Sequence, residues 1–201
     1  MTIVSPFLTF PNTGWWMQVA GAGLVLLDKG EHFSKMSYRN RYRISGANNP
    51  ILLTVPLVKG RNQREPMSGV QIFNEERWQV QHWRTLVSVY KRSPFFDHYE
   101  DSLRPLYEQK FTHLTDFNIA ALEWAQKQLK LPLITELTDT YQKEYPPEVK
   151  DLRIAGNAPA DFPRYYQVFE DRIGFQADLS ILDLLFSEGP GARGWLISRK
   201  S

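Results

Sequence analysis

The sequence predicts an α/β fold, in which a single domain contains a small, mostly parallel or mixed sheet flanked by helices. Short, unbroken apolar runs such as residues 24–27 are typical of buried strands. Residues 74–129 instead carry apolar side chains at helical spacing. The chain has 201 residues, of which 42% are hydrophobic and 23% are charged, and these values fit one globular domain.

The first third of the chain is expected to be rich in strands. Pro6 places the first strand at a sheet edge or interrupts it, because proline cannot donate to a strand ladder. Two later apolar runs end at Asp28 and at Pro56, which mark the ends of two more strands. The expected elements are strands at 3–10, 24–27, 51–55 and 70–73 and a short helix at 15–22.

The middle of the chain predicts three helices. Asn74 is expected to cap the first helix, and Ser93 caps the second, with Pro94 in its first turn. Pro105 is expected to kink the second helix, and Pro132 ends the third. These helices are expected at 74–92, from 93, and from about 115, and a strand follows at 133–137.

The C-terminal part has weaker patterns. Residues 145–163 contain four prolines and lack periodicity, so we expect a mobile loop there that can act as a lid. A last strand is expected at 165–169. A short helix follows at 179–186, capped by Asp178 or Ser180 and stopped at Gly189.

Composition excludes several kinds of site. The chain has no cysteine, so disulfides, thiolate zinc sites and a cysteine nucleophile are absent. No glycine-rich phosphate motif, serine nucleophile motif or histidine pair at metal-ligand spacing is present, so we expect no cofactor and no metal. A net charge of +2 does not indicate nucleic-acid or membrane binding. No apolar run is long enough to span a bilayer, and no signal-peptide pattern is present, so a cytoplasmic protein is expected.

Asp28 and His32 are the sharpest catalytic candidates. Asp28 directly follows a predicted buried strand, and ligands of open α/β sheets bind beyond the carboxyl ends of strands. Histidine is a common general acid or base, so His32 suits that role, while Asp28 orients it or binds a substrate hydroxyl. In the structural alternative, Asp28 caps a loop and His32 packs under it.

The cations that follow are candidates for substrate binding. Lys35, Arg39 and Arg41 would hold phosphates or a carboxylate, and Tyr38 can stack on a base or sugar. In the alternative, Arg39, Arg41 and Arg43 alternate along a strand and form its solvated face, which we favour for Arg43. Asn40 and Arg84 would form a polar wall of the same substrate-binding site.

Two buried polar positions need an explanation. His82 shares an apolar helix face with Trp78, so it is either a hydrogen-bonded core histidine or the wall of a substrate pocket. Asp183 lies within an apolar helix, where an unpaired charge is unfavourable, so we expect an ion pair with one of the arginines. Asn118 raises the same question.

An ordered set of short motifs along the chain resembles the WbqC-like protein family. The set runs from near residue 7 to near residue 196, and we expect residues 1–201 to form a single WbqC-like domain. Many members have a His-Gln-Pro-x-Tyr-x-Pro stretch after the first strand, but here residues 8–15 read LTFPNTGW, without that histidine. The motifs are LD at 27–28, FSK at 33–35, YRNR at 38–41, LTVP at 53–56, Trp78, HWR at 82–84, Tyr90, SPFF at 93–96, FN at 117–118, LSILDLLF at 179–186 and GP at 189–190.

The resemblance implies a bacterial protein of surface polysaccharide or O-antigen metabolism. The function it implies is an acyl or aminoacyl transferase that acts on a small-molecule substrate, a nucleotide sugar or an amino sugar. The alternative is a non-catalytic binding or scaffold protein in a surface-glycan pathway, which the missing histidine favours. The enzyme hypothesis requires Asp28, His32, Arg39 and Arg41 to converge on one pocket. The sequence leaves the oligomeric state open.

Overall fold

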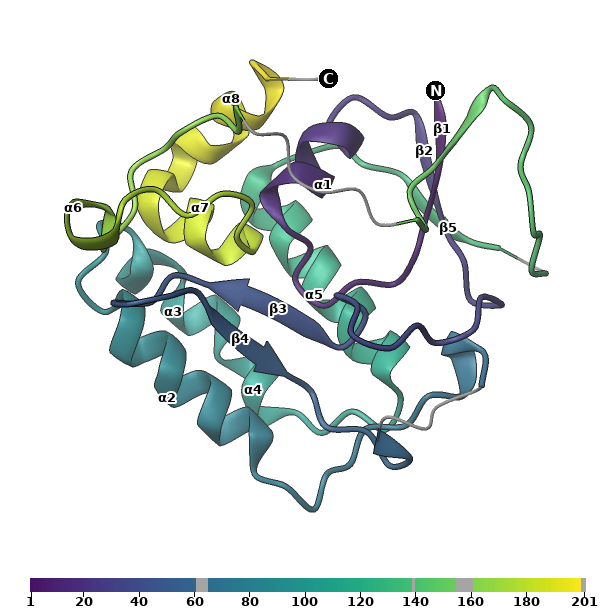
Figure 1. Cartoon of the computed structure of the whole chain (residues 1–201), viewed down its shortest axis with the longest axis horizontal. Coiled ribbons are helices and arrows are strands. Elements are labelled where there is room, and N and C mark those ends of the chain that lie inside the picture. Colours follow the sequence, from purple (N-terminus) through teal and green to yellow (C-terminus); the bar gives the residue numbers. More distant parts are fainter. Residues whose placement is uncertain (61–64, 139, 155–160, 200–201) are drawn as a thin grey trace.

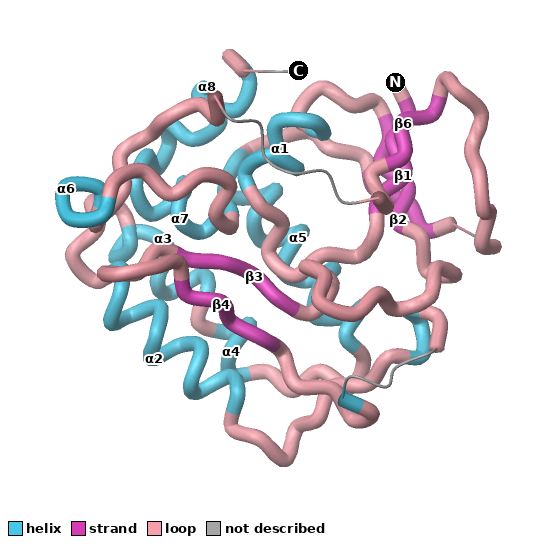
Figure 2. The backbone as a smooth tube through the Cα atoms, viewed as in Figure 1, coloured by secondary structure: helices cyan, strands magenta, loops and turns pink. Residues whose placement is uncertain are grey.

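The computed structural model describes residues 1–60, 65–138, 140–154 and 161–199, and it confirms the α/β fold (Figure 1). Its main sheet is parallel, with the strand order β5-β2-β1-β6. The strands are β1 (Thr2–Ser5), β2 (Leu24–Leu27), β5 (Thr135–Leu137) and β6 (Val149–Asp151). A separate antiparallel pair joins β3 (Arg41–Ile44) to β4 (Ile51–Thr54) and lies apart from the parallel sheet in Figure 2.

The helices fill the space around and between the two sheets. The long helix α5 (Leu114–Leu129) packs against α4 (Pro105–Glu108) and α7 (Ile181–Glu188), so it links helices from the middle and the C-terminal part of the chain. The remaining helices are α1 (Thr13–Val19), α2 (Trp78–Tyr90), α3 (Phe96–Leu103), α6 (Glu170–Ile173) and α8 (Ala192–Ile197), with short 3-10 helices η2 (Met67–Gly69) and η3 (Gly189–Gly191).

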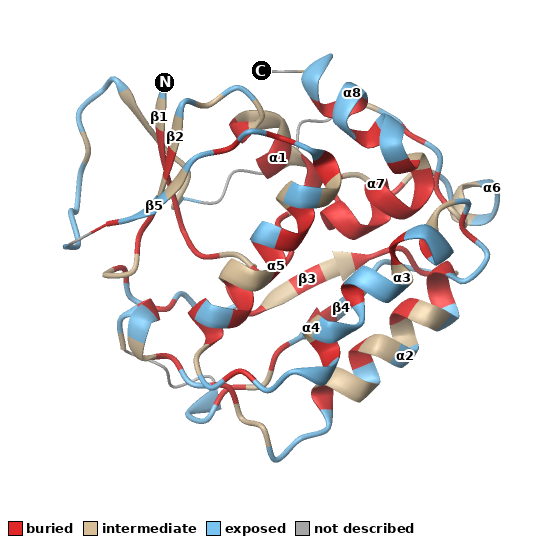
Figure 3. Ribbon diagram, turned by 180° about the vertical axis from the view of Figure 1, so that it is seen from behind, coloured by how far each residue is buried: buried red, intermediate tan, exposed pale blue. Residues whose placement is uncertain are grey.

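The core is apolar and rich in aromatic rings. Phe10, in the segment after β1, lies 5.2 Å from Tyr42 of β3, 5.9 Å from Phe117 and 6.3 Å from Trp124, measured between ring centroids. Tilted and edge-to-face rings at these distances attract each other in addition to the area they bury. In Figure 3 the buried residues concentrate on β1, α7 and the inner side of α5. This core joins the segment that follows β1 to β3 and α5.

The first strand and the first two helices have different limits from those expected. β1 ends at Ser5 and not at residue 10, because Pro6 follows and has no N–H to donate. Asn12 caps α1 by accepting from the Trp15 amide at 3.1 Å, so the helix begins before Trp15. Asn74 does not cap α2, which begins at Trp78; its side chain donates to the Phe111 carbonyl instead.

Two predicted strands are wrong. Residues 70–73 form only isolated bridges, in which Ile72 pairs with Leu57 and Gln71 with His113. Residues 165–169 run irregularly into the short helix α6. Both segments have alternating or apolar side chains but no neighbouring strand to complete a ladder.

The expected loop at 145–163 contains β6, which pairs in parallel with β1. The part of that loop at 155–160 lies outside the described residues. Ser180, and not Asp178, caps α7 by accepting from the Leu182 amide at 3.3 Å. Helix α8 was not expected. Within the described residues, no helix combines the length and apolar character needed to cross a membrane.

Candidate functional site at the carboxyl edge of the parallel sheet

Four strands deliver polar side chains to one edge of the parallel sheet. Asp28 and Thr138 directly follow β2 and β5, while Ser5 and Asp151 are the last residues of β1 and β6. Parallel strands end at the same edge, so these side chains face a common region. The strand order reverses between β1 and β6, and ligands of open α/β sheets bind in the crevice at such a reversal.

Asp28 is fully buried at this edge. Its Oδ1 atom accepts hydrogen bonds from the amides of Gly30 and Glu31 at 3.0 and 3.1 Å and from the Thr138 hydroxyl at 3.2 Å. Its Oδ2 atom pairs with Nη1 of Arg153 at 2.8 Å. Asp28 therefore both closes the turn after β2, as the structural alternative predicted, and takes part in a charged cluster.

Arg153 is the centre of that cluster. Its Nη2 lies 2.6 Å from Asp151 Oδ2, and its Nε lies 3.0 Å from Asp151 Oδ1. The guanidinium also donates to the carbonyls of Gln142 and Lys143 at 2.6 and 3.2 Å. The hydrogen bonds that Arg153 donates to Asp151 lower the pKa of that carboxylate below its usual value. A side chain that is 9% exposed thus ties β6, β2 and the chain at 142–143 together.

A second buried ion pair lies beside the first. Arg39 donates to both oxygens of Glu31, at 2.9 Å from Nε and 2.6 Å from Nη2. Burial raises the pKa of Glu31, and the hydrogen bonds and charge of Arg39 oppose that effect. Nη2 of Arg39 also reaches the backbone carbonyl of Arg153 at 3.5 Å, so the two ion pairs are in contact.

Two tyrosine rings contact the Arg153 guanidinium. The rings of Tyr145 and Tyr141 have their centroids 4.8 and 5.6 Å from its central carbon, which is cation–π distance. The Tyr145 hydroxyl is buried and has no hydrogen-bond partner within the described part of the protein. Burial raises the pKa of Tyr145, and the negative charge of Asp28 adds to this effect. The edge therefore combines carboxylates, cations and aromatic faces.

The other predicted site residues divide into three groups. His32 and Lys35 are exposed on the loop that follows β2, where His32 forms a bridge with Pro66. Asn40 is buried and donates to the Val55 carbonyl at 2.9 Å, a structural contact. Tyr38 and Arg41 are half-buried, and Arg84 is exposed on α2. Tyr38 has the Arg43 guanidinium 5.8 Å from its ring centroid, and Arg43 also donates to two backbone carbonyls.

His82 lies in the core. Its Nδ1 is 3.0 Å from the Tyr42 hydroxyl and its Nε2 is 3.2 Å from the Thr54 carbonyl, so both ring nitrogens are used within the protein. Burial lowers the pKa of His82 to about 4. The neutral, hydrogen-bonded form is typical of a core histidine, the structural alternative considered from the sequence.

The expected ion pair of Asp183 is wrong. None of the ion pairs among the described residues includes this carboxylate, which accepts from the hydroxyls of Tyr90 and Tyr165 and from the side chain of Gln167. Asn118 is also satisfied, because it accepts from the Thr9 hydroxyl and donates to the Arg39 carbonyl. Neutral hydrogen-bond donors therefore satisfy Asp183 in place of the arginine that the sequence suggested.

Of the four residues that the enzyme hypothesis requires in one pocket, the structure brings Asp28 and Arg39 together, through Glu31 and Arg153. His32 instead lies exposed on the loop, and Arg41 is half-buried in β3. Sequence reasoning missed Asp151, Arg153 and Tyr145, which all come from the segment expected to be a loop. The only local signal was the β-branched Val149 two residues before Asp151, which is too weak by itself to predict a strand. Among the described residues, no group of three or more acidic or histidine side chains is placed to hold a metal ion.

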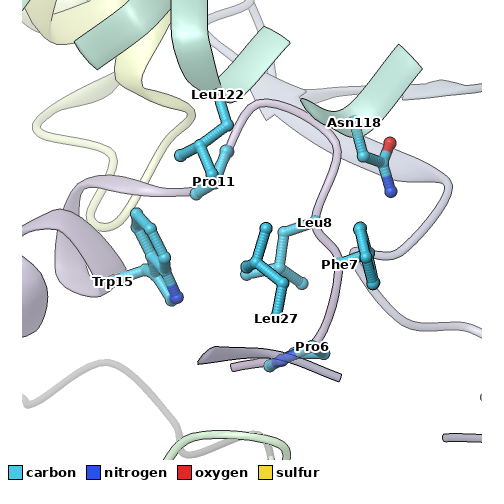
Figure 4. A pocket seen from close by; sticks show the side chains of 8 residues that line it. All are labelled: Pro6, Phe7, Leu8, Pro11, Trp15, Leu27, Asn118 and Leu122. Carbon is cyan, nitrogen blue, oxygen red and sulfur yellow. The ribbon is translucent and has the colours of Figure 1, made fainter. Parts of the chain in front are cut away.

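A small cavity lies beside the segment that leaves β1 (Figure 4). Its volume is about 10 Å³, which is room for about one water or methyl group. Leu27 in its wall directly precedes Asp28, so the cavity adjoins the carboxyl edge but is too small for a sugar ring. Its lining is Pro6, Phe7, Leu8, Pro11, Trp15, Leu27, Asn118 and Leu122.

A family model describing the WbqC-like protein family matches residues 8–155. This range contains Asp28, Glu31, Arg39, Asp151 and Arg153, so the match covers the whole charged cluster. The C-terminal motif at 179–186 lies outside it. No curated protein and no solved structure matches the chain.

Proposed function

The chain belongs to the WbqC-like protein family, and we propose that it is a transferase of bacterial surface-polysaccharide metabolism. In this proposal it moves an acyl or aminoacyl group to an amino sugar, free or nucleotide-linked, at the carboxyl edge of the parallel sheet. One observation carries the proposal: two contacting ion pairs, Asp28–Arg153 and Glu31–Arg39, lie buried at that edge. Charged side chains are unfavourable to bury unless they are paired, and clusters of buried charged groups occur at functional sites.

The chemistry assigns different roles to the buried and exposed residues. In this step the amino group attacks the carbonyl of an acyl-CoA thioester, the amide C–N bond forms, the C–S bond breaks and the thiol leaves. The attacking nitrogen loses a proton, which a carboxylate or a histidine can accept and pass to the leaving thiolate. Asp28 serves at the strand end and His32 on the exposed loop beyond it. Lys35 and Arg41, which are more exposed than Arg39, bind the phosphates of a nucleotide sugar. Arg39 holds Glu31 and positions the loop.

A second function is favoured by a specific observation. The donors of Arg153 are used by Asp28, Asp151 and backbone carbonyls, and the cluster as a whole is paired within itself. A cluster of this kind also suits a binding protein that recognises a surface-glycan precursor without changing it. Binding of a sugar without group transfer would distinguish this function from the first.

A thermal-shift screen followed by a transfer assay tests the proposal. Amino sugars, nucleotide sugars, amino acids and acyl-CoA compounds are screened against wild type, Asp28→Asn and His32→Ala. The matched controls are Asp101→Asn and His98→Ala, which replace exposed residues of α3. We expect an amino-sugar compound to raise Tm in wild type and both controls, and Asp28→Asn to abolish the shift.

The transfer assay then separates the two functions. Transfer that His32→Ala slows, with binding retained, supports the transferase and the role of His32. Binding without transfer by wild type supports the non-catalytic function. Equal shifts in wild type and Asp28→Asn would remove the carboxyl edge as the site.

A further inference from the structure

The guanidinium of Arg153 sits in a cage built from several parts of the chain. The carboxylates of Asp28 and Asp151 contact it at 2.8 and 2.6 Å. Two backbone carbonyls complete the polar side, and two tyrosine rings face it at 4.8 and 5.6 Å. We use "cation cage" for Asp28, Asp151, Tyr141, Tyr145 and the carbonyls of Gln142 and Lys143.

The groups that form the cation cage can bind organic cations in general. Carboxylates supply charge-assisted hydrogen bonds, and aromatic faces attract a cation through their quadrupole. A guanidinium or a primary ammonium group of a separate molecule would meet the same partners that Arg153 meets. The cage thus has the composition of a recognition site, and it is filled by a side chain of the same protein.

One wall of the cage comes from an exposed segment without regular secondary structure. Tyr141 is 51% exposed, and residues 140–148 contain no helix or strand. Among the described residues the Tyr145 hydroxyl is also buried without a hydrogen-bond partner, which costs free energy. A ligand that brings a hydrogen-bonding group beside its cation would relieve that cost, whereas Arg153 does not.

We propose that the cation cage binds the ammonium or guanidinium group of a ligand, and that Arg153 is an internal competitor that occupies the cage when the ligand is absent. The inference deepens the proposed function, on which it rests for the amino sugar as the natural ligand. An ammonium group in this cage would lie between Asp28 and Asp151, at the sheet edge where the strand order reverses.

Removal of the competitor tests the proposal with methylguanidinium as the probe. In calorimetric titration, Arg153→Ala should bind methylguanidinium about 10-fold or more tightly than wild type, because apparent affinity rises when the competent state is no longer masked. Asp28→Asn in the Arg153→Ala background should lose this binding. The control is Arg164→Ala, which removes an arginine from an exposed ion pair with Glu170 and should behave as wild type.

Either of two results would overturn the proposal: no tighter binding by Arg153→Ala than by Arg164→Ala, or tight binding that survives the loss of Asp28. Hydrogen exchange in wild type provides a second measurement if Arg153→Ala does not fold. Saturating methylguanidinium should speed exchange of the Arg153 amide, which donates to Asp151 at 2.9 Å. Unchanged exchange there would count against displacement of Arg153.

The outcome is independent of the transferase reaction. Methylguanidinium binding without any response to amino sugars would leave the cage in place and refute the proposed function. Amino-sugar transfer with no cation binding in the cage would support the proposed function and refute the cation cage.

Discussion

Asp183→Asn should remove a pH dependence of stability that lies between about pH 4 and pH 6. The Asp183 carboxylate is fully buried in α7. It accepts from Tyr90 at 2.6 Å, from Tyr165 at 2.8 Å and from Gln167 at 3.1 Å. Burial raises the pKa of Asp183 from 3.8 to about 6, and these three hydrogen bonds only partly oppose the rise.

Proton binding by Asp183 decides whether the free energy of unfolding rises or falls with pH. Because the pKa of Asp183 is higher in the folded chain, the folded state binds the proton more tightly than the unfolded state. The resulting stabilisation is fully present below pH 3.8 and is lost as the pH rises through about 6. The difference between 3.8 and about 6 is about 2 in pKa, which corresponds to about 3 kcal/mol in total. Relative to neutral pH, about 1 kcal/mol is recovered at about pH 5 and about 2 kcal/mol at about pH 4.5.

Urea unfolding of wild type and Asp183→Asn from about pH 7.5 to about pH 4.5 measures this effect. The other carboxylates are common to both proteins, so they cancel in the difference between the two free energies of unfolding. That difference should shift in favour of wild type by about 2 kcal/mol as the pH falls over this range. Asp101→Asn, an exposed change on α3, reports the effect of losing one charge. A flat difference, or one that shifts in favour of the variant, would refute the reasoning.

Two further predictions concern the edge and the end of α7. Arg39→Met should lower the free energy of unfolding by about 3–5 kcal/mol, because it leaves Glu31 buried without its bidentate partner. Glu31→Leu combined with Arg39→Met should recover most of this loss in urea unfolding, and a double variant as unstable as the single one would contradict us. Gly189→Ala should destabilise by about 2 kcal/mol or more, because Gly189 has φ +53° and a Cβ there would lie 2.4 Å from Phe95. Its control in the same Tm measurement, Gly194→Ala on the exposed side of α8, should be neutral or stabilise by up to about 1 kcal/mol, and equal losses would contradict the prediction.

Helices α2, α5 and α7 and strand β2 could be predicted because their signals are local. The apolar run at 24–27 and the helical spacing of Trp78, Leu86 and Val89 do not depend on distant parts of the chain. β6 could not be found in this way. Its three residues form a strand because β1 lies beside them, and Thr2 pairs with Val149. The reverse holds at 165–169, where strand-like residues have no neighbour to pair with.

The candidate site was also predictable only where its residues follow a strand that the sequence reveals. Asp28 was identified because it ends a recognisable strand, and a carboxylate there suggested a site. Arg153 follows a strand that the sequence does not reveal, so its contact with Asp28 could not be foreseen. Asp183 was expected to need a cation, but hydroxyl donors from Tyr90 and Tyr165 satisfy it, and no sequence pattern distinguishes these two solutions.

The parallel order β5-β2-β1-β6 also has a consequence for the folding rate. β1 lies between β2, which follows it closely in the chain, and β6, whose residue Val149 pairs with Thr2. Closing so long a loop loses chain entropy before any contact compensates for it, and contacts of this kind slow folding. The β1–β2 pair can therefore form early and β6 joins late. The ion pair between Asp28 and Arg153 joins residues 125 positions apart, so we expect the charged cluster to be completed late in folding.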